Sequence, residues 1–394
     1  MSHGCLLRKP IPSLGMRVSI AGLACLAACA PPGPGTRILS STAPRLREQV
    51  WHVEWRVQVR PDVTEEPPVR AQLWRWRPEE TAVPLVVEPE HEIVVGSTSG
   101  VLRAYDLEGR PRWRYAAGGP IEQQPAYARD EIFVASADGS VHALVARTGH
   151  ELWSRVIGEQ PATPPVVSGG IVYLATHQTS VFALDAGTGA SRWHYRREQE
   201  REFTLRTVAA PVPSGGFVYT GFSDGTTVAL RADTGEVVWQ RASGPGDQFI
   251  DAGATPQLAG GRVYVATYRD GVFALDAKSG DLVWRKPMPG ATGLLLRDGL
   301  LFVGAVGKVV ALAPGDGSLL WERGLGDRSP GPLRLTGTIL VVPASDALVF
   351  LNDRTGERLG EGFNPGRGVD APAAIEGRNL YVLSNAGWLY ALSL

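Results

Sequence analysis

The sequence predicts an all-β protein, an eight-bladed β-propeller of four-stranded blades. Two observations support this architecture: a short motif recurs at a period near forty residues, and no amphipathic helical period of useful length occurs. In the motif a Gly precedes a Trp by four positions. Six copies are complete, at Gly109 and Trp113, Gly149 and Trp153, Gly189 and Trp193, Gly235 and Trp239, Gly280 and Trp284, and Gly317 and Trp321.

Each motif is the second half of a hairpin. In residues 225–239 an alternating apolar run through Val228 and Leu230 leads to a polar corner at Gly235, and a second run ends in Trp239. Alternation over so few residues is typical of strands, and Asp, Thr and Gly between two such runs indicate a turn. The glycine serves the corner, because Gly adopts backbone conformations that other residues avoid.

A proline opens the first half of most repeats. Successive repeat starts are 38 to 46 residues apart, at Pro84, Pro125, Pro165, Pro211, Pro256, Leu294, Pro332 and Pro372. Leu294 replaces the proline in the sixth repeat. We expect Met288 and Leu294, which follow Trp284, to lie on a short surface connection.

The two chain ends predict how the ring closes. The seventh repeat has Gly360 where the Trp is expected, and the eighth ends at Leu394 one strand short. Residues 51–59 resemble a strand without a local partner. Since an unpaired sheet edge promotes aggregation, we expect this segment to complete the last blade.

The first residues predict export and a lipid anchor. Basic residues precede an apolar run of eleven residues, Val18 to Ala28, which is too short to span a bilayer. The ending Leu-Ala-Ala-Cys29 resembles a bacterial lipobox, so residues 1–28 are interpreted as a lipoprotein signal peptide and Cys29 as the lipidated residue. An ordinary secretory signal is the alternative. Residues 29–49, rich in Pro, Gly and Ser, are predicted to be a flexible tether, and 50–394 the propeller.

Composition excludes several functions for the body of the chain. All three cysteines lie within the first 29 residues, so the body has no nucleophilic or zinc-binding Cys. Removal of residues 1–28 leaves 36 basic residues against 40 acidic ones, which argues against a nucleic-acid partner. Residues 221–225 match G-x-S-x-G, but a strand follows where a nucleophile elbow needs a helix, so Ser223 is assigned to a turn. The repeated Trp side chains are interpreted as inter-blade packing, with each indole N–H donated to a backbone carbonyl, rather than as a cofactor site.

The repeat Ala-Leu-Asp-x-x-Thr/Ser-Gly-x-x-x-Trp, as in Ala274 to Trp284, resembles the tryptophan-docking motif of PQQ-like (quinoprotein) eight-bladed propellers. That superfamily includes quinone-dependent dehydrogenases and the BamB lipoproteins of the outer-membrane β-barrel assembly machinery. The dehydrogenases carry adjacent cysteines and acidic calcium ligands that this body lacks, whereas a lipobox, a tether and one bare ring resemble the BamB family. The residue after Cys29 is Ala30 rather than Asp, and by the same resemblance the destination is the outer membrane, facing the periplasm.

Two connections between blades are longer than the others. From Trp to the next repeat start there are 18 residues after Trp193 and 17 after Trp239, against 10 to 12 elsewhere. Binding residues commonly lie on loops of a rigid scaffold, although long surface loops are also tolerated at little cost. In the BamB family these loops carry Leu-x-Leu-Arg and Asp-x-Asp runs that contact the barrel subunit BamA. Here Phe203, Leu205, Arg206 and Asp251 match in kind and order, with Gly253 in place of the second Asp; we call these four residues the candidate patch.

The sequence thus favours a non-enzymatic, lipid-anchored scaffold without cofactor or metal. Its expected partners are a BamA-like barrel subunit and unfolded outer-membrane proteins. A dehydrogenase dependent on pyrroloquinoline quinone, and a periplasmic propeller that binds another protein or a small ligand, are the alternatives.

Overall fold

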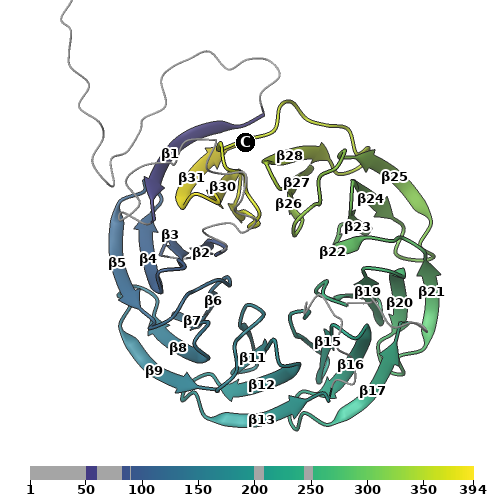
Figure 1. Ribbon diagram of the computed structural model, residues 1–394, viewed down its shortest axis with the longest axis horizontal. Helices are drawn as coiled ribbons and strands as arrows, with labels where there is room; N and C mark the ends of the chain where they lie inside the picture. The colour runs from purple at the N-terminus through teal and green to yellow at the C-terminus, as the bar shows by residue number, and fades with distance from the viewer. Residues whose placement is uncertain (1–49, 60–81, 89, 199–207, 244–251) are drawn as a thin grey trace, which may run out of the picture. The chain divides into compact units, whose positions relative to one another are not determined.

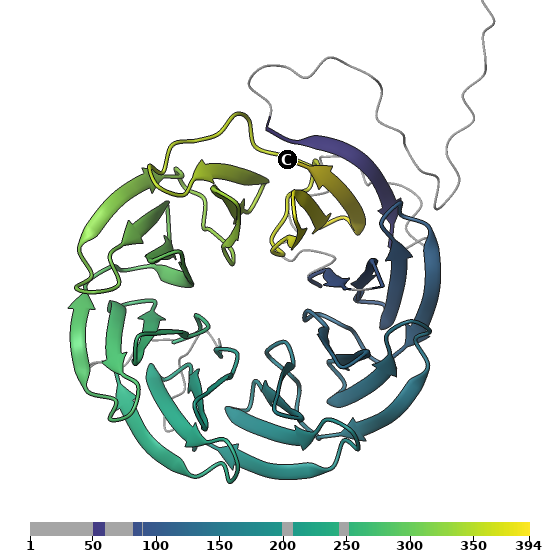
Figure 2. The ribbon, with the colours of Figure 1, turned by 180° about the vertical axis from the view of Figure 1, so that it is seen from behind.

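A computed structural model describes residues 50–59, 82–88, 90–198, 208–243 and 252–394, all of which belong to one compact unit, Pro34–Leu394. Strands are the only regular elements in these ranges, and they form eight sheets arranged around an axis (Figures 1 and 2). The predicted all-β, eight-bladed propeller is confirmed.

The strands of each blade follow one another along the chain from the axis to the rim. Blades 1 to 3 contain β2 (Leu85–Val87), β3 (Glu92–Val95), β4 (Val101–Asp106) and β5 (Pro111–Ala116); β6 (Ala126–Ala128), β7 (Glu131–Ala135), β8 (Ser140–Val145) and β9 (Glu151–Val156); and β10 (Val166–Ser168), β11 (Ile171–Ala175), β12 (Ser180–Asp185) and β13 (Ser191–Arg196).

Blades 4 to 6 have the same order. They contain β14 (Val212–Ser214), β15 (Phe217–Gly221), β16 (Thr226–Arg231) and β17 (Val237–Ala242); β18 (Gln257–Ala259), β19 (Arg262–Thr267), β20 (Gly271–Asp276) and β21 (Leu282–Lys286); and β22 (Ala291–Arg297), β23 (Leu300–Ala305), β24 (Lys308–Leu312) and β25 (Leu319–Gly324).

The last two blades differ from the others. Blade 7 contains β26 (Arg334–Thr336), β27 (Ile339–Ala344) and β28 (Ala347–Asn352), and blade 8 contains β29 (Ala374–Glu376), β30 (Asn379–Leu383), β31 (Trp388–Ser393) and, outermost, β1 (His52–Gln58). Strand β1 pairs antiparallel with β31, from His52 opposite Ser393 to Gln58 opposite Trp388. The N-terminal strand therefore supplies the rim of the last blade, at the place where the sequence lacked one.

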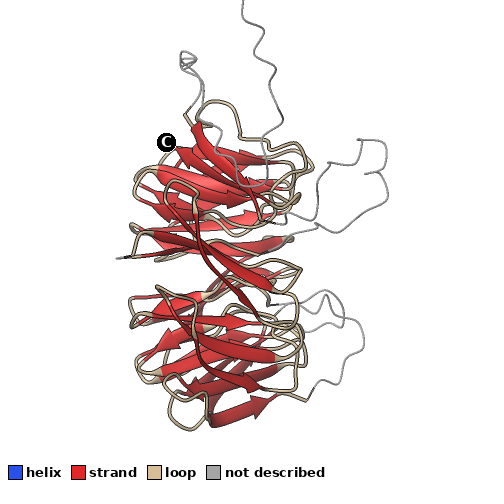
Figure 3. Cartoon of the chain, turned by 90° about the vertical axis from the view of Figure 1, so that its left-hand side faces the viewer, coloured by secondary structure: helices blue, strands red, loops and turns tan. Residues whose placement is uncertain are grey.

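The alternating strands divide the ring into two faces. Because consecutive strands are antiparallel, the turns after the first and third strand of a blade lie at one end, which we call the corner face. The turn after the second strand and the connection to the next blade lie at the other end, which we call the loop face. Figure 3 shows the ring from the side, with strands running between the two faces.

The geometry that recurs at the corners from blade to blade explains the Gly–Trp motif. Each Trp lies against the corner Gly of the following blade: a Cβ atom at Gly189 would be 2.6 Å from Cε3 of Trp153. The indole N–H donates to a backbone oxygen of that blade, for example Trp153 to Ala186 at 2.8 Å and Trp239 to Ala277 at 3.0 Å. The predicted packing of Trp between blades is confirmed at all six copies, and the predicted backbone acceptor at five of them.

Trp113 departs from the expectation. Its Nε1 donates to the Glu92 carboxylate at 3.2 Å instead of to a backbone carbonyl. Glu92 belongs to β3 of the same blade and is buried, and this burial raises the pKa of its carboxyl group. The indole therefore donates a hydrogen bond to a buried carboxylate, which needs such a partner.

Blade 7 has no regular outer strand. Two isolated bridges, Leu348 to Phe363 and Leu351 to Arg358, replace it. Trp51 closes this junction from the N-terminal segment: its ring meets Phe363 edge-on at 5.0 Å, and its Nε1 donates to the oxygen of Glu361 at 2.9 Å. An aromatic contact thus replaces the Gly–Trp pair at the junction of blades 7 and 8.

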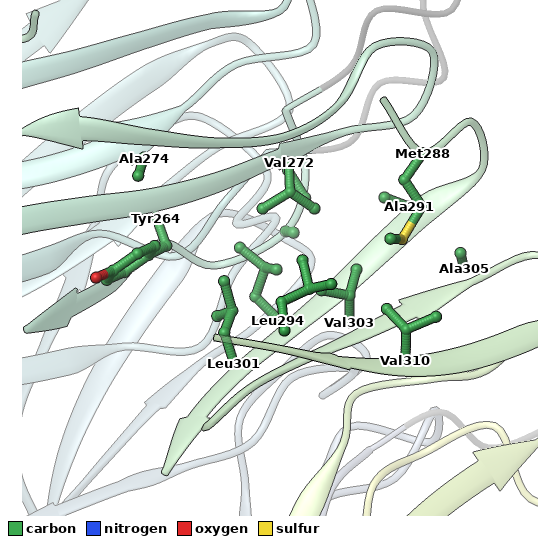
Figure 4. Packing of buried hydrophobic residues seen from close by; sticks show 13 residues of the cluster. Tyr264, Val272, Ala274, Met288, Ala291, Leu294, Leu301, Val303, Ala305 and Val310 are labelled. Carbon is green, nitrogen blue, oxygen red and sulfur yellow. The ribbon is translucent and has the colours of Figure 1, made fainter. Parts of the chain in front are cut away.

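The connection after Trp284 is not the surface loop that the sequence suggested. Met288 is 5% exposed and Leu294 9% exposed, and Leu294 lies within β22 rather than before it. Both pack with Leu301 and Val303 in the core between blades 5 and 6 (Figure 4). The prediction was wrong because this connection is short, so the chain enters the next blade directly and its apolar side chains turn inward.

Candidate functional site

The four residues of the candidate patch lie outside the described residues, as does Cys29. The structure does describe the residues on either side of the two long connections. Their contacts show where each connection is attached to the ring. The first connection runs from β13 to β14 and the second from β17 to β18, so both begin and end at the loop face, one on each side of blade 4.

The first connection leaves blade 3 through Arg197. Its guanidinium donates from Nε to Asp224 Oδ2 at 2.6 Å and from Nη2 to Thr226 Oγ1 at 3.0 Å. Burial alone would lower the pKa of Arg197, but the hydrogen bond and the charge of Asp224 outweigh it and raise the pKa. Since only 22% and 11% of the two side chains are exposed, water screens this ion pair weakly. Arg197 therefore ties the start of the connection to blade 4.

The same connection re-enters through Val208 and Ala209, which are buried. The N–H of Ala209 donates to the oxygen of Gly221 at 3.0 Å, and the hydroxyl of Thr220 donates to the oxygen of Ala209 at 2.7 Å. Both bonds go to the end of β15, so the two ends of the first connection are fixed to one blade.

The second connection is rooted on the same turn. The N–H of Ser243 donates to the oxygen of Gly225 at 3.1 Å before it, and the N–H of Ala252 donates to the oxygen of Phe222 at 3.0 Å after it. Ala252 packs so closely that a Cβ atom at Gly221 would lie 2.4 Å from its oxygen. Glycine is needed at Gly221 for this close approach, which gives the G-x-S-x-G match a structural cause.

These contacts converge on the turn Phe222–Gly225 between β15 and β16, which we call the anchor turn. Ser223 lies within it and is buried, as predicted for a hairpin turn rather than a nucleophile elbow. Sequence reasoning placed the two connections on neighbouring blades but missed Arg197 and Asp224 as their shared support. No motif marks that pair, because a single Arg and a single turn Asp are common on any propeller surface.

A second polar cluster joins blades 1 and 2, and it resembles a Ser-His-acid arrangement. Ser140 Oγ is 2.7 Å from His142 Nε2, and His142 Nδ1 is 3.4 Å from Glu151 Oε2 and 2.9 Å from the hydroxyl of Tyr115, which also donates to Glu151. Ser140 is buried, and its hydroxyl also lies 2.6 Å from Asp138 Oδ1. The serine is therefore not placed as a nucleophile.

A cluster of calcium ligands does not occur in the described part of the ring. Calcium requires several hard oxygen ligands that converge on one point. Among the described residues no three His, Cys, Asp or Glu side chains are close enough to hold a metal ion. These residues therefore do not fit a calcium ion.

The fold and the site define a quinoprotein-type propeller with two extended connections rooted at one turn of its loop face. A family model described as outer membrane protein assembly factor BamB matches residues 36–305, 244–362 and 269–394. The chain belongs to this family. Within the described residues there is also no helix long and apolar enough to cross a membrane.

Individual relatives are more distant. An outer membrane protein assembly factor BamB from Xanthomonas campestris is 30% identical over 133 residues, which cover 31% of this chain and 32% of that protein. A polyvinylalcohol dehydrogenase from Sphingopyxis is 32% identical over 141 residues, 28% of this chain and 22% of that protein. The match thus spans about a third of the length of the BamB relative and less of the dehydrogenase.

The crystal structure of BamB from Moraxella catarrhalis matches with a TM-score of 0.71 at 22% identity, covering 88% of this chain and 98% of that one. At this identity the likeness shows the fold alone.

Proposed function

We propose that this protein is a non-enzymatic, lipid-anchored scaffold of the machinery that assembles outer-membrane β-barrels. Family membership supports the assembly role. In this proposal the protein is attached through Cys29 to the outer membrane and faces the periplasm, and its tether, residues 29–49, holds the ring away from the lipid.

The partner in this proposal is the barrel subunit BamA, bound through the candidate patch of Phe203, Leu205, Arg206 and Asp251; unfolded outer-membrane proteins are further clients. One observation carries the proposal: both long connections are attached to the anchor turn, the first by Arg197 and the second by Ser243 and Ala252. Ala209 fixes the other end of the first connection to the adjoining end of β15. Residues carried on two loops with a common base can act as one contact surface. An apolar pair flanked by Arg has the composition of a binding hot spot.

Capture of the purified periplasmic region of the barrel subunit tests the partner. Leu205→Ala combined with Arg206→Ala should weaken capture by about thirtyfold or more, because hot-spot truncation commonly costs about 2 kcal/mol or more per residue. The melting temperature should stay within a few degrees of that of the wild type.

The control must sit on the same face without supporting the core. Val306 and Lys308 flank the turn between β23 and β24 on the loop face of blade 6, and Val306 is 45% exposed. Val306→Ala combined with Lys308→Ala removes one aliphatic and one cationic side chain, as the test variant does. Equal loss of capture in both double variants would overturn the assignment of the patch.

The anchor has its own test. Cys29→Ala should abolish metabolic labelling with a radioactive fatty acid and release the protein from outer-membrane fractions in soluble form. Continued partition of the variant with the outer membrane would refute the lipoprotein assignment.

A further inference from the structure

A small cavity lies between blades 4 and 5, beside the root of the second long connection. Its volume is about 110 Å³. The walls come from Arg241, Ser243 and their neighbours on blade 4, and from Phe273, Leu275 and Arg285 on blade 5. The floor is apolar, since Phe273 and Leu275 are buried.

The polar groups around this cavity are incompletely paired. The Ser243 hydroxyl oxygen is buried and has no hydrogen-bond partner among the residues that the structure describes. The carboxylate of Asp270 forms ion pairs with two nearby guanidinium groups: Nη2 of Arg269 and Nη2 of Arg285 each lie 3.1 Å from one of its oxygens. Arg241, also on the lining, forms no hydrogen bond or ion pair with another residue of the described chain. Within the described residues, the guanidinium of Arg241 and the hydroxyl of Ser243 therefore have no protein partner, and both border a cavity with an apolar floor.

The size of the cavity restricts what it accepts. A single water needs only about 10–15 Å³ of such volume, and sites for drug-sized ligands begin near 300 Å³. A volume between these limits suits one side chain. Methylene groups against Phe273 and Leu275, with a carboxylate toward Arg241 and Ser243, would give a partner to the guanidinium of Arg241 and to the hydroxyl of Ser243.

The position of the cavity indicates whose side chain enters it. Ser243 lines the cavity and also anchors the second long connection on Gly225. The cavity therefore lies beside the described root of the connection that is proposed to carry part of the candidate patch. We infer that it is a socket for an Asp or Glu side chain of the protein that docks on the loop face; the identity of that partner rests on the proposed function.

A photo-cross-linking amino acid at Leu282 tests the socket in the full lipid-anchored chain in bacterial envelopes. Leu282 is on the lining and 46% exposed, and Leu152 on β9 of blade 2, 47% exposed, is the control position. We expect a light-dependent adduct from Leu282 alone, mapping to a partner peptide that contains Asp or Glu.

Two arginine variants make the test specific. Arg241→Gln should lower the adduct yield about tenfold, because it removes one partner of a charge-assisted bond. Arg155 is the matched control, because Arg155 and Arg241 each lie two residues after the Trp of an outer strand and both are exposed. Arg155→Gln should leave the yield unchanged, and both variants should keep the wild-type melting temperature.

The outcomes separate the socket from the proposed function. An Asp- or Glu-containing adduct on a protein other than the barrel subunit would support the socket and overturn the proposed partner. Capture of the barrel subunit without an Arg241-dependent adduct at Leu282 would support the function and overturn the socket. An adduct to residues 244–251 of the same chain, or to a second copy, would also overturn it, because the chain would then fill its own socket.

Discussion

The indole of Trp55 lies against Gly109, with its Nε1 2.7 Å from the oxygen of Leu107 to which it donates. This is the contact that Trp153 makes with Gly189, yet Trp55 comes from the N-terminal strand. The closing strand thus supplies both the missing edge and the missing tryptophan of blade 8. Trp55 is 3% exposed, and its ring also lies 6.2 Å from that of Tyr381 in the same blade.

Trp55→Ala should destabilise the ring by about 3–5 kcal/mol, as is usual for truncation of a buried aromatic residue. Chemical denaturation of the purified protein measures the loss. Trp51→Ala is the control on the same segment, and because Trp51 is only half-buried its effect should be clearly smaller. Equal losses would show that Trp55 has no special role in closure.

Gly189→Ala should be more harmful than Gly169→Ala in the same blade. Both glycines have positive φ, 69° and 59°, so each change costs about 1–2 kcal/mol in the backbone. At Gly189 the new Cβ atom also collides with Trp153, which adds about 1–3 kcal/mol, whereas at Gly169 no atom lies within 4 Å. Thermal melts of the two variants compare them directly, and similar melting temperatures would contradict the tryptophan-docking account.

Arg197→Gln should loosen the root of the first long connection. Because the Arg197–Asp224 pair is largely shielded from water, its loss should cost about 1–3 kcal/mol, less than for a fully buried pair. Capture of the barrel subunit should fall as well, although every residue of the candidate patch is retained.

Arg192→Gln is the control for Arg197. It removes an ion pair of the same length, 2.6 Å to Asp185, whose side chains are 48% and 28% exposed. Because water screens such an exposed pair, we expect little change in stability. If Arg192→Gln reduces capture as much as Arg197→Gln does, the anchor turn has no particular importance for binding.

The stability that Asp276 contributes at the corner of blade 5 should decrease in acid. Backbone N–H groups of Ser279 and then Lys278 donate to Asp276 and lower its pKa below the usual 3.8. A carboxyl group with a depressed pKa stabilises the fold above its unfolded-state pKa, and this contribution is lost as pH falls through the folded-state value. Stability attributable to Asp276 should therefore be complete above about pH 5 and should be lost progressively below about pH 4, as the pH falls through the depressed folded-state pKa.

Blade 7 supplies the control for the acid prediction. Asn352 occupies the equivalent corner and accepts the N–H groups of Arg354 and Thr355 at 2.9 and 3.0 Å without a charge. Asp276→Asn should thus fold normally at neutral pH and melt with a weaker dependence on pH between 3 and 5. An unchanged pH profile would show that Asp276 does not titrate with folding.

The proposed absence of catalysis is tested with the cofactor itself. Purified protein should not bind pyrroloquinoline quinone in calorimetry, with or without calcium, and should not oxidise alcohols or sugars with an artificial electron acceptor. Stoichiometric binding of the quinone would favour the dehydrogenase alternative.

The repeat made most of the fold predictable. Proline and the Gly–Trp motif recur at fixed distances, so the starts of strands such as β6 after Pro125 and β10 after Pro165 follow from the period. The role of Trp55 was not predictable from local sequence, because its partner Gly109 belongs to another blade. The surface position predicted for Met288 and Leu294 was wrong, because the burial of a side chain depends on how short its connection is relative to the gap between blades.

The candidate site was predictable only in part. Loop length identified the two connections, because extra residues change the period of the repeat. The Arg197–Asp224 pair and the socket beside Ser243 depend on side chains that meet across blades. Nothing in the period of a repeat specifies such contacts.

The pairing of β1 with β31 also governs when the molecule can fold. Ser393 donates a hydrogen bond to Glu54 across 339 residues of chain. Contacts between such distant residues form slowly, because the whole intervening chain must first be ordered. Blades 1 to 7 can form in the order of synthesis, but the ring stays open, with β1 unpaired, until the last residues have been made. Until then the partner edge of β31 is uncovered, and an uncovered strand edge is where one chain associates with another.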